Sequence, residues 1–145
     1  MNRRELLLGA AAMAAAATTS RVFAAGHEHE HQHSTVSPYD KLIAAAADCT
    51  LKANLCLQHC IVLLGKGETD MAACARSASQ AAAICTALQQ LAFSNARQLP
   101  QLAKVAMDIC KECEEECKKT ERHPECKACK EACIACYKEC QAIAA

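Results

Sequence analysis

The sequence predicts an all-α fold, an antiparallel four-helix bundle with a cysteine-lined core. Apolar and small residues recur in steps of three and four along four segments, which is the period of one helix face. Alternating runs typical of β-strands are absent, and aromatic residues make up only 3% of the 145 residues. The stripes hold 13 cysteines in positions that leucine normally occupies. Short connections between the segments favour antiparallel neighbours.

Residues 1–24 have the pattern of a twin-arginine signal peptide. Arg3 and Arg4 precede an alanine-rich apolar run that is too short to span a bilayer as a permanent anchor. Small residues at its end predict cleavage after Ala24, with Ala25 as second choice, and an uncleaved anchor as the alternative. Because the twin-arginine route exports folded proteins, we expect export to the periplasm or to the lumen of internal membranes.

Residues 25–36 are predicted to form a flexible, histidine-rich tail that captures metal ions. If cleavage follows Ala24, the new amino terminus and His27 could form a square-planar site for Cu(II) or Ni(II). A merely solvated linker is the alternative. The tail histidines are His27, His29, His31 and His33.

The charge balance gives no reason to expect a nucleic acid or an anionic membrane as partner. The whole chain has 16 basic and 16 acidic side chains, and the leader removes three arginines and one glutamate, which leaves a mature charge of −2.

Residues 37–145 are predicted to form the bundle. The first helix should start with Ser37 as N-cap and Pro38 at the first helical position, and Gly65 and Gly67 should end it. The second should start with Thr69 as N-cap. The first inner stripe comprises Leu42, Ala46, Cys49, Ala53, Cys56, Cys60 and Leu63. The second comprises Met71, Cys74, Ala78, Ala81, Cys85, Leu88 and Ala92, before an end at Ser94-Asn95.

The third helix has two possible starts, since Pro100 is either an early helical residue or a kink in a helix that begins near Ala96. The fourth is predicted to run from about Pro124 to Ile143. The third stripe comprises Ala103, Ala106, Cys110, Cys113 and Cys117. The fourth comprises Cys126, Cys129, Cys133, Cys136 and Cys140.

Thirteen converging thiols predict a site for soft metal ions, because thiolates select Cu(I), Zn(II) and iron–sulfur clusters. Charge favours Cu(I): one thiolate per ion is neutral, whereas four thiolates on Zn(II) or a cluster leave a buried negative charge. Two-coordinate Cu(I) needs sulfurs roughly 4–4.5 Å apart, which cysteines at i and i+4 or on adjacent helices can provide. We therefore expect about a dozen Cu(I) ions per chain.

Other interpretations remain open at this point. The Cys-x-x-Cys pairs resemble zinc or iron–sulfur motifs, although they lack the turn residues that such motifs need. Disulfides between helices could instead make the chain a structural bundle, whereas bridges within one helix are disfavoured by geometry. A thiol redox enzyme would need one exposed cysteine of low pKa, and none is singled out. No catalytic constellation is present, so we expect no enzyme.

The chain resembles the bacterial copper storage proteins that methane-oxidising bacteria export. The resemblance covers the leader, the His-rich mature start, the Cys49, Cys56 and Cys60 spacing with His59 before Cys60, Met71 three residues before Cys74, and the five-cysteine last helix.

The resemblance implies a tetramer of bundles filled with Cu(I) bound as paired thiolates. It implies supply of copper to an enzyme such as the membrane-bound methane monooxygenase. It also implies that copper enters at one open end, where His59 and Met71 match the family and Leu63 replaces a further methionine.

Overall fold

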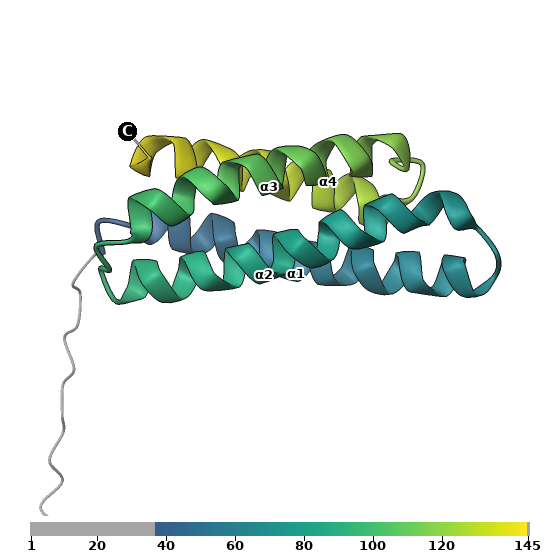
Figure 1. The fold of residues 1–145 in the computed structure, drawn as a ribbon, viewed down its shortest axis with the longest axis horizontal. Coiled ribbons are helices and arrows are strands. Elements are labelled where there is room, and N and C mark those ends of the chain that lie inside the picture. The colour runs from purple at the N-terminus through teal and green to yellow at the C-terminus, as the bar shows by residue number, and fades with distance from the viewer. Residues whose placement is uncertain (1–36, 145) are drawn as a thin grey trace, which may run out of the picture. The chain divides into compact units, whose positions relative to one another are not determined.

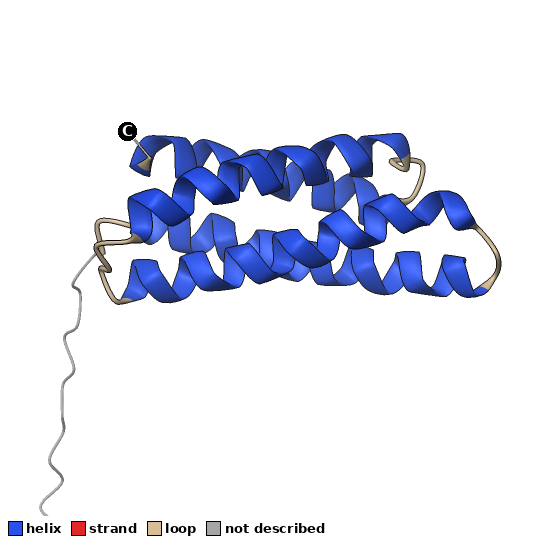
Figure 2. Ribbon diagram, in the orientation of Figure 1, coloured by secondary structure: helices blue, strands red, loops and turns tan. Residues whose placement is uncertain are grey.

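The computed structural model describes residues 37–144. The predicted leader and the tail with its four histidines therefore lie outside the described residues. Within them the chain is helical and contains no strand, as predicted (Figure 2). The elements are α1 (Asp40–Gly65), the 3-10 turn η1 (Thr69–Met71), α2 (Ala72–Phe93), α3 (Leu99–Lys119) and α4 (Pro124–Ile143).

The predicted start of α1 is wrong by two residues, because the helix begins at Asp40 and not at Pro38. Ser37 does not cap the helix; its hydroxyl accepts a hydrogen bond from the Tyr39 backbone N–H at 3.2 Å, within a turn that precedes Asp40. Thr69 is likewise not an N-cap but the first residue of η1. The end of α1 predicted from two glycines is correct, since the helix ends at Gly65 and Gly67 takes a positive φ of 91°.

The two later helices start where proline allows. Pro100 lies in the first turn of α3, which begins at Leu99, so it does not kink a helix that starts near Ala96. Pro124 begins α4 as predicted, and the preceding His123 is extended, as expected for a residue before proline. Asn95, which ends the α2 region, has a φ of 51°, the left-handed conformation that asparagine tolerates.

The four long helices form an up-down-up-down bundle (Figure 1). Each helix lies beside its neighbour in sequence, and α1 also lies beside α4, so the four surround one core. One end carries the α1–α2 connection and the α3–α4 turn, and we call it the histidine end after His59 and His123. The other carries the α2–α3 connection, and we call it the leucine end after Leu42, Leu88 and Leu99.

The core is narrow because alanine and cysteine supply most of its side chains. Every residue predicted on the four inner stripes is buried, and α2 buries three more small residues, Ala75, Ser77 and Ala82. Small side chains let helices approach closely, so sulfur atoms on facing helices can come into contact. None of the helices in the described residues is both long and apolar enough to cross a bilayer.

Candidate metal centre

All thirteen cysteines face the bundle core, and none forms a disulfide. Each is at most 1% exposed, which places the thiols among the most buried side chains of the chain. The periodicity of the sequence explains this, since a stripe in steps of three and four keeps one helix face toward the core. The predicted disulfide-linked alternative has no support in these residues.

The sulfur atoms in the half of the core nearer the histidine end are centred on Cys56. Its Sγ lies 3.6 Å from that of Cys74 on α2, 3.7 Å from that of Cys126 on α4 and 4.0 Å from that of Cys117 on α3. Cys60, one turn along α1, is 4.0 Å from Cys56. Sulfurs from all four helices therefore meet within one layer of the bundle.

The array continues through the middle of the core along α3 and α4. Cys117 and Cys113 have sulfurs 3.9 Å apart on successive turns of α3, and Cys113 lies 3.7 Å from Cys129 on α4. Cys113, Cys129 and Cys133 form a group whose sulfurs are all within 4.8 Å of one another. Cys133 then lies 3.7 Å from Cys49, which leads toward the leucine end.

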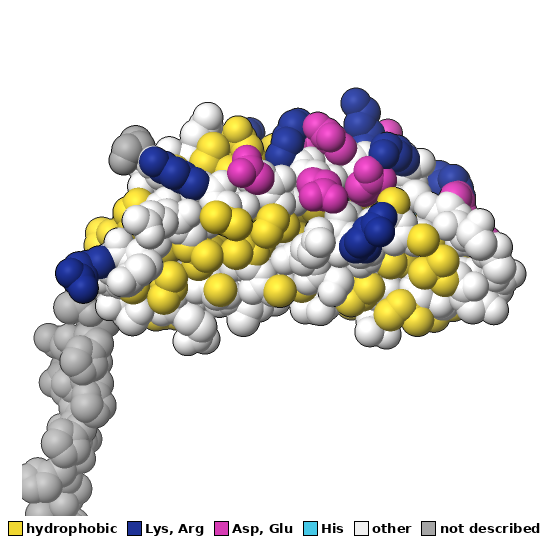
Figure 3. Space-filling model, in the orientation of Figure 1, with side chains coloured by type: hydrophobic (Ala, Val, Ile, Leu, Met, Phe, Trp, Pro, Cys, Tyr) yellow, Lys and Arg dark blue, Asp and Glu magenta, His cyan; other side chains and the backbone are white. Residues whose placement is uncertain are grey.

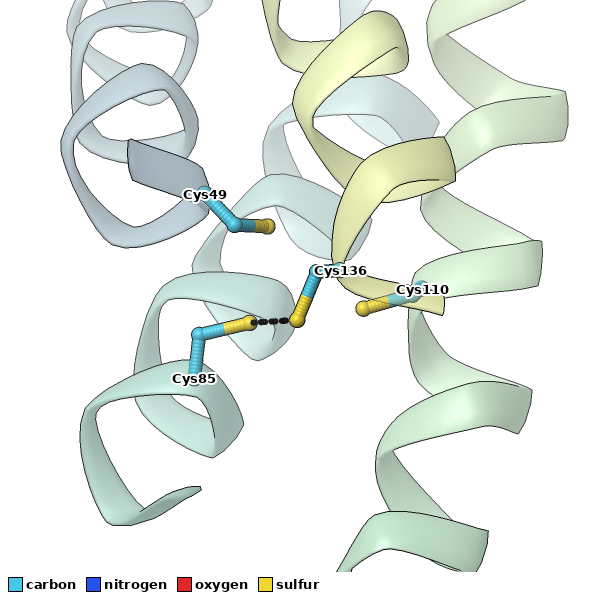
Figure 4. Close-up of side chains that lie close together, drawn as sticks. All are labelled: Cys49, Cys85, Cys110 and Cys136. Carbon is cyan, nitrogen blue, oxygen red and sulfur yellow. Dashed lines mark hydrogen bonds between the residues drawn. The ribbon is translucent and has the colours of Figure 1, made fainter. Parts of the chain in front are cut away.

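The last group takes one thiol from each helix: Cys49, Cys85, Cys110 and Cys136 (Figure 4). The four side chains point toward one another, and the sulfurs of Cys85 and Cys136 lie 3.6 Å apart. All four sulfurs are within 4.8 Å of each other. Cys140 is buried one turn beyond Cys136 but belongs to none of the four groups of closely spaced sulfurs.

Contacts between the thiols divide them into those that ionise more readily and those that resist ionisation. Hydrogen bonds from Cys110 and then Cys133 stabilise the Cys49 thiolate and lower its pKa to about 5. The pKa of Cys74 is lowered in the same way, chiefly by Cys117.

Other thiols resist ionisation. The pKa of Cys56 is raised, mainly by its hydrogen bond to Cys117, and that of Cys133 by its hydrogen bond to Cys110, with burial adding to both. Burial is the main cause that raises the pKa of Cys60. The thiols of the core therefore differ in how readily they ionise.

The core contains no charged side chain. Among the described residues, the buried polar side chains are only Ser77 and Thr120, and each hydroxyl donates to a backbone carbonyl one turn earlier. A buried site with net negative charge would have no cation beside it. The core therefore suits a metal whose charge a single thiolate neutralises.

His59 and Met71 both lie at the histidine end, as predicted. Met71 is fully buried at the end of η1, directly before α2, and His59 has a side chain 23% exposed. The sequence did not single out His123 and Glu125, which lie beside His59. The two imidazole rings have centroids 4.8 Å apart, and Glu125 Oε2 lies 3.5 Å from His59 Nδ1. Antiparallel helices bring the end of α1 to the start of α4, a signal that could have revealed both residues.

Comparison with known proteins shows which solved structures and which family this chain is similar to. Apo copper storage protein 3 from Bacillus subtilis is 28% identical, with a TM-score of 0.65 over 72% of this chain and 97% of that one. The Cu(I)-bound copper storage protein BsCsp3 is 29% identical, with a TM-score of 0.66 over 72% of this chain and 95% of that one. No curated protein matches the chain significantly. The family model for the copper storage proteins matches residues 35–145, and the chain therefore belongs to the copper storage protein family.

Proposed function

We propose that the chain stores about a dozen Cu(I) ions as thiolate complexes along the core, because it offers 13 thiols and one thiolate balances each ion. One observation carries the proposal: an unbroken array of buried sulfurs, with neighbours 3.5–4.0 Å apart, runs from Cys60 to Cys129. It continues through Cys133 to the four-thiol group that includes Cys49. A solved relative binds Cu(I) in the same fold. Storage rather than catalysis is the role of the family.

Loading exchanges protons for copper. Each thiol that binds Cu(I) loses its proton, so a neutral thiol becomes a neutral copper–thiolate unit and the core gains no net charge. An ion between two thiolates needs its sulfurs slightly further apart than most of those here, which rotation about χ1 can provide without moving a helix. The bundle therefore does not have to unfold or change its backbone to be filled.

Zinc is the closest competitor, because Cys49, Cys85, Cys110 and Cys136 provide the four sulfurs of a structural zinc site. Zn(II) with four thiolates would carry a charge of −2 into a core that has no buried Lys or Arg within residues 37–144. The same argument applies to iron–sulfur clusters. Charge therefore favours Cu(I) over both.

An anaerobic titration of the reduced protein with Cu(I), against a chromogenic Cu(I) chelator, tests the proposal. We expect about a dozen tightly held ions per chain, close to one per thiol. A capacity of one to four ions would contradict storage and would favour a discrete zinc or iron–sulfur site.

We further propose that the protein is exported by the twin-arginine route and supplies a copper enzyme such as methane monooxygenase. The support is the leader, with Arg3 and Arg4 before its apolar run, and the resemblance to exported storage proteins. Replacing both arginines with lysine should retain the protein in the cytosol, as fractionation would show. Normal export of this variant would contradict the proposed route.

We also propose that the bundle forms homo-oligomers, with a tetramer expected, and that α1 and α2 make the contact. Along α2 the charged residues are limited to Arg76, whereas α3 carries many (Figure 3). The neighbouring α1 exposes Leu51, Leu55 and Val62 by half or more, and they recur on one side of the helix. A glutamate at Leu55 should yield monomers in light scattering, and an unchanged mass would exclude this face.

A further inference from the structure

Three buried polar atoms lack partners, and all three lie at one place. Within residues 37–144 the buried side-chain nitrogen and oxygen atoms without a hydrogen bond are His59 Nε2, His123 Nε2 and Glu125 Oε2. Such atoms are rare in native proteins, and each calls for an explanation such as a bound ion or an ordered water. Their concentration at the histidine end points to a ligand rather than to three unrelated packing defects.

Two segments of the fold hold these side chains, the end of α1 and the start of α4. His59 projects from the last turns of α1, Glu125 from the first turn of α4, and His123 from the residue before α4. The His123 backbone N–H donates to the Thr120 carbonyl at 3.0 Å. In the same turn, Arg122 binds Asp70 of η1 at 2.9 Å, which ties the α3–α4 turn to the α1–α2 connection.

The donor chemistry is that of a histidine metal site. A metal-bound imidazole usually donates its other N–H to a carboxylate, which fixes the tautomer and the ring orientation. Glu125 is placed for this role: its Oε2 lies 3.5 Å from His59 Nδ1, within ion-pair distance but without a hydrogen bond, while His59 Nε2 is the ring nitrogen that lacks a partner. His123 Nε2 supplies the second nitrogen, with the two ring centroids 4.8 Å apart.

We propose that His59 and His123 bind one borderline divalent cation, Zn(II) or Cu(II), through their Nε2 atoms, with Glu125 orienting His59. Nitrogen and carboxylate donors suit such ions better than they suit Cu(I), which the sulfurs beyond them select. The site contains no thiol and lies at the end of the bundle where the resemblance to the family implies that Cu(I) enters. The inference depends on the proposed storage function only for the assumption that copper passes this end on its way to the core.

The experiment uses the full chain with the four tail histidines replaced by glutamine, because the sequence contains six histidines and only His59 and His123 then remain. The core is first filled with Cu(I), and a Cu(I) chelator removes ions held by imidazole but not by thiolate. Zn(II) is the probe, since it is not reduced by thiols. Calorimetry then measures binding, and nitrogen NMR of labelled histidines identifies the bound atoms.

We expect one Zn(II) per chain and a shift of both Nε2 resonances. His59→Gln or His123→Gln should weaken binding by about 100-fold or more, and Glu125→Gln by about 10- to 100-fold, as is typical when an orienting carboxylate is removed. Glu121→Gln is the matched control, because this acid in the same turn pairs with Lys130 rather than with a histidine. It should leave Zn(II) affinity unchanged.

Two results would overturn the inference: unshifted Nε2 resonances in the tail-substituted protein, or Zn(II) affinity that survives His59→Gln and His123→Gln. Copper capacity, measured on each variant, separates this failure from failure of the storage function. Full Cu(I) capacity with unshifted Nε2 resonances would reject the divalent site and leave the storage function standing. Low Cu(I) capacity with shifted Nε2 resonances would reject the storage function and still support the divalent site.

Discussion

Cys133→Ser tests whether the thiols act as independent copper ligands or hold the fold. Cys133 is fully buried, and a buried hydroxyl without a partner costs about 1–3 kcal/mol. Serine in a helix can instead donate to the carbonyl one turn earlier, as Thr50 and Thr86 do in this chain at 2.9 and 2.8 Å. We therefore expect a loss near the lower limit, about 1 kcal/mol, which leaves the apo bundle folded.

The copper effect should be equally limited. Removing one thiolate should lower capacity by about one ion of about a dozen. Filling should also slow in its final phase, because Cys133 lies 3.7 Å from Cys49 and leads to the group nearest the leucine end. Anaerobic Cu(I) titration with stopped-flow absorbance measures both quantities, and urea unfolding measures stability.

Ala132→Ser is the matched control. This neighbouring residue of α4 is 4% exposed, so the substitution buries a similar hydroxyl without removing a sulfur. It should change stability by a similar amount and leave capacity intact. A collapse of the circular dichroism of Cys133→Ser, or a capacity reduced by half, would refute the view that the thiols are independent ligands on a bundle held by its other residues.

Three further predictions concern stability and loading. Leu42→Ala, at the leucine end, should lower the free energy of unfolding in urea by about 2–5 kcal/mol, and Val105→Ala on the exposed face of α3 by less than about 0.5 kcal/mol. Copper capacity should stay unchanged in both variants, and equal losses of stability would contradict the burial of Leu42. The apo protein should lose stability as the pH rises above 9.0, the ordinary pKa of a thiol. The pKa of Cys56 and Cys133 is raised in the folded state, so these thiols ionise first in the unfolded chain. Their contribution to the free energy of unfolding is therefore complete below that pH and declines above it. Urea midpoints at rising pH check this, and the Cu(I)-filled protein should show no such decline. Deleting residues 25–33 should slow loading or change Cu(II) capture without lowering Cu(I) capacity, and a halved capacity would show that the tail belongs to the store.

Sequence periodicity predicts which faces are buried, and here it was correct for every residue of the four stripes. A helix turns by a constant angle per residue, so a stripe is a local property that needs no tertiary information. Helix starts were predicted less well: Ser37 and Thr69 are good capping residues, but the chain forms a turn at one and a 3-10 turn at the other. Such local choices depend on how the segment meets the rest of the bundle.

The neighbours of each sulfur could not be predicted from the stripes. Contact between Cys49 and Cys133 depends on how far α1 and α4 slide along each other, which spacing within one helix does not determine. The contacts of His59 with His123 and Glu125 were easier to predict, because antiparallel neighbours bring the end of α1 to the start of α4. The tail histidines, which lie outside the described residues, stay a prediction.

The leucine end has a consequence for the order in which copper would leave. Leu42, Leu88 and Leu99 are at most 1% exposed and fill the bundle at this end, where Cys140 is the one thiol beyond the Cys49 group. An ion held by the Cys49 group could therefore depart only past every ion bound after it. The protein would work as a last-in, first-out stack, in which isotopically labelled copper added at the end of loading is the first to reach an acceptor. Its oldest copper would form a reserve that is released only under prolonged demand.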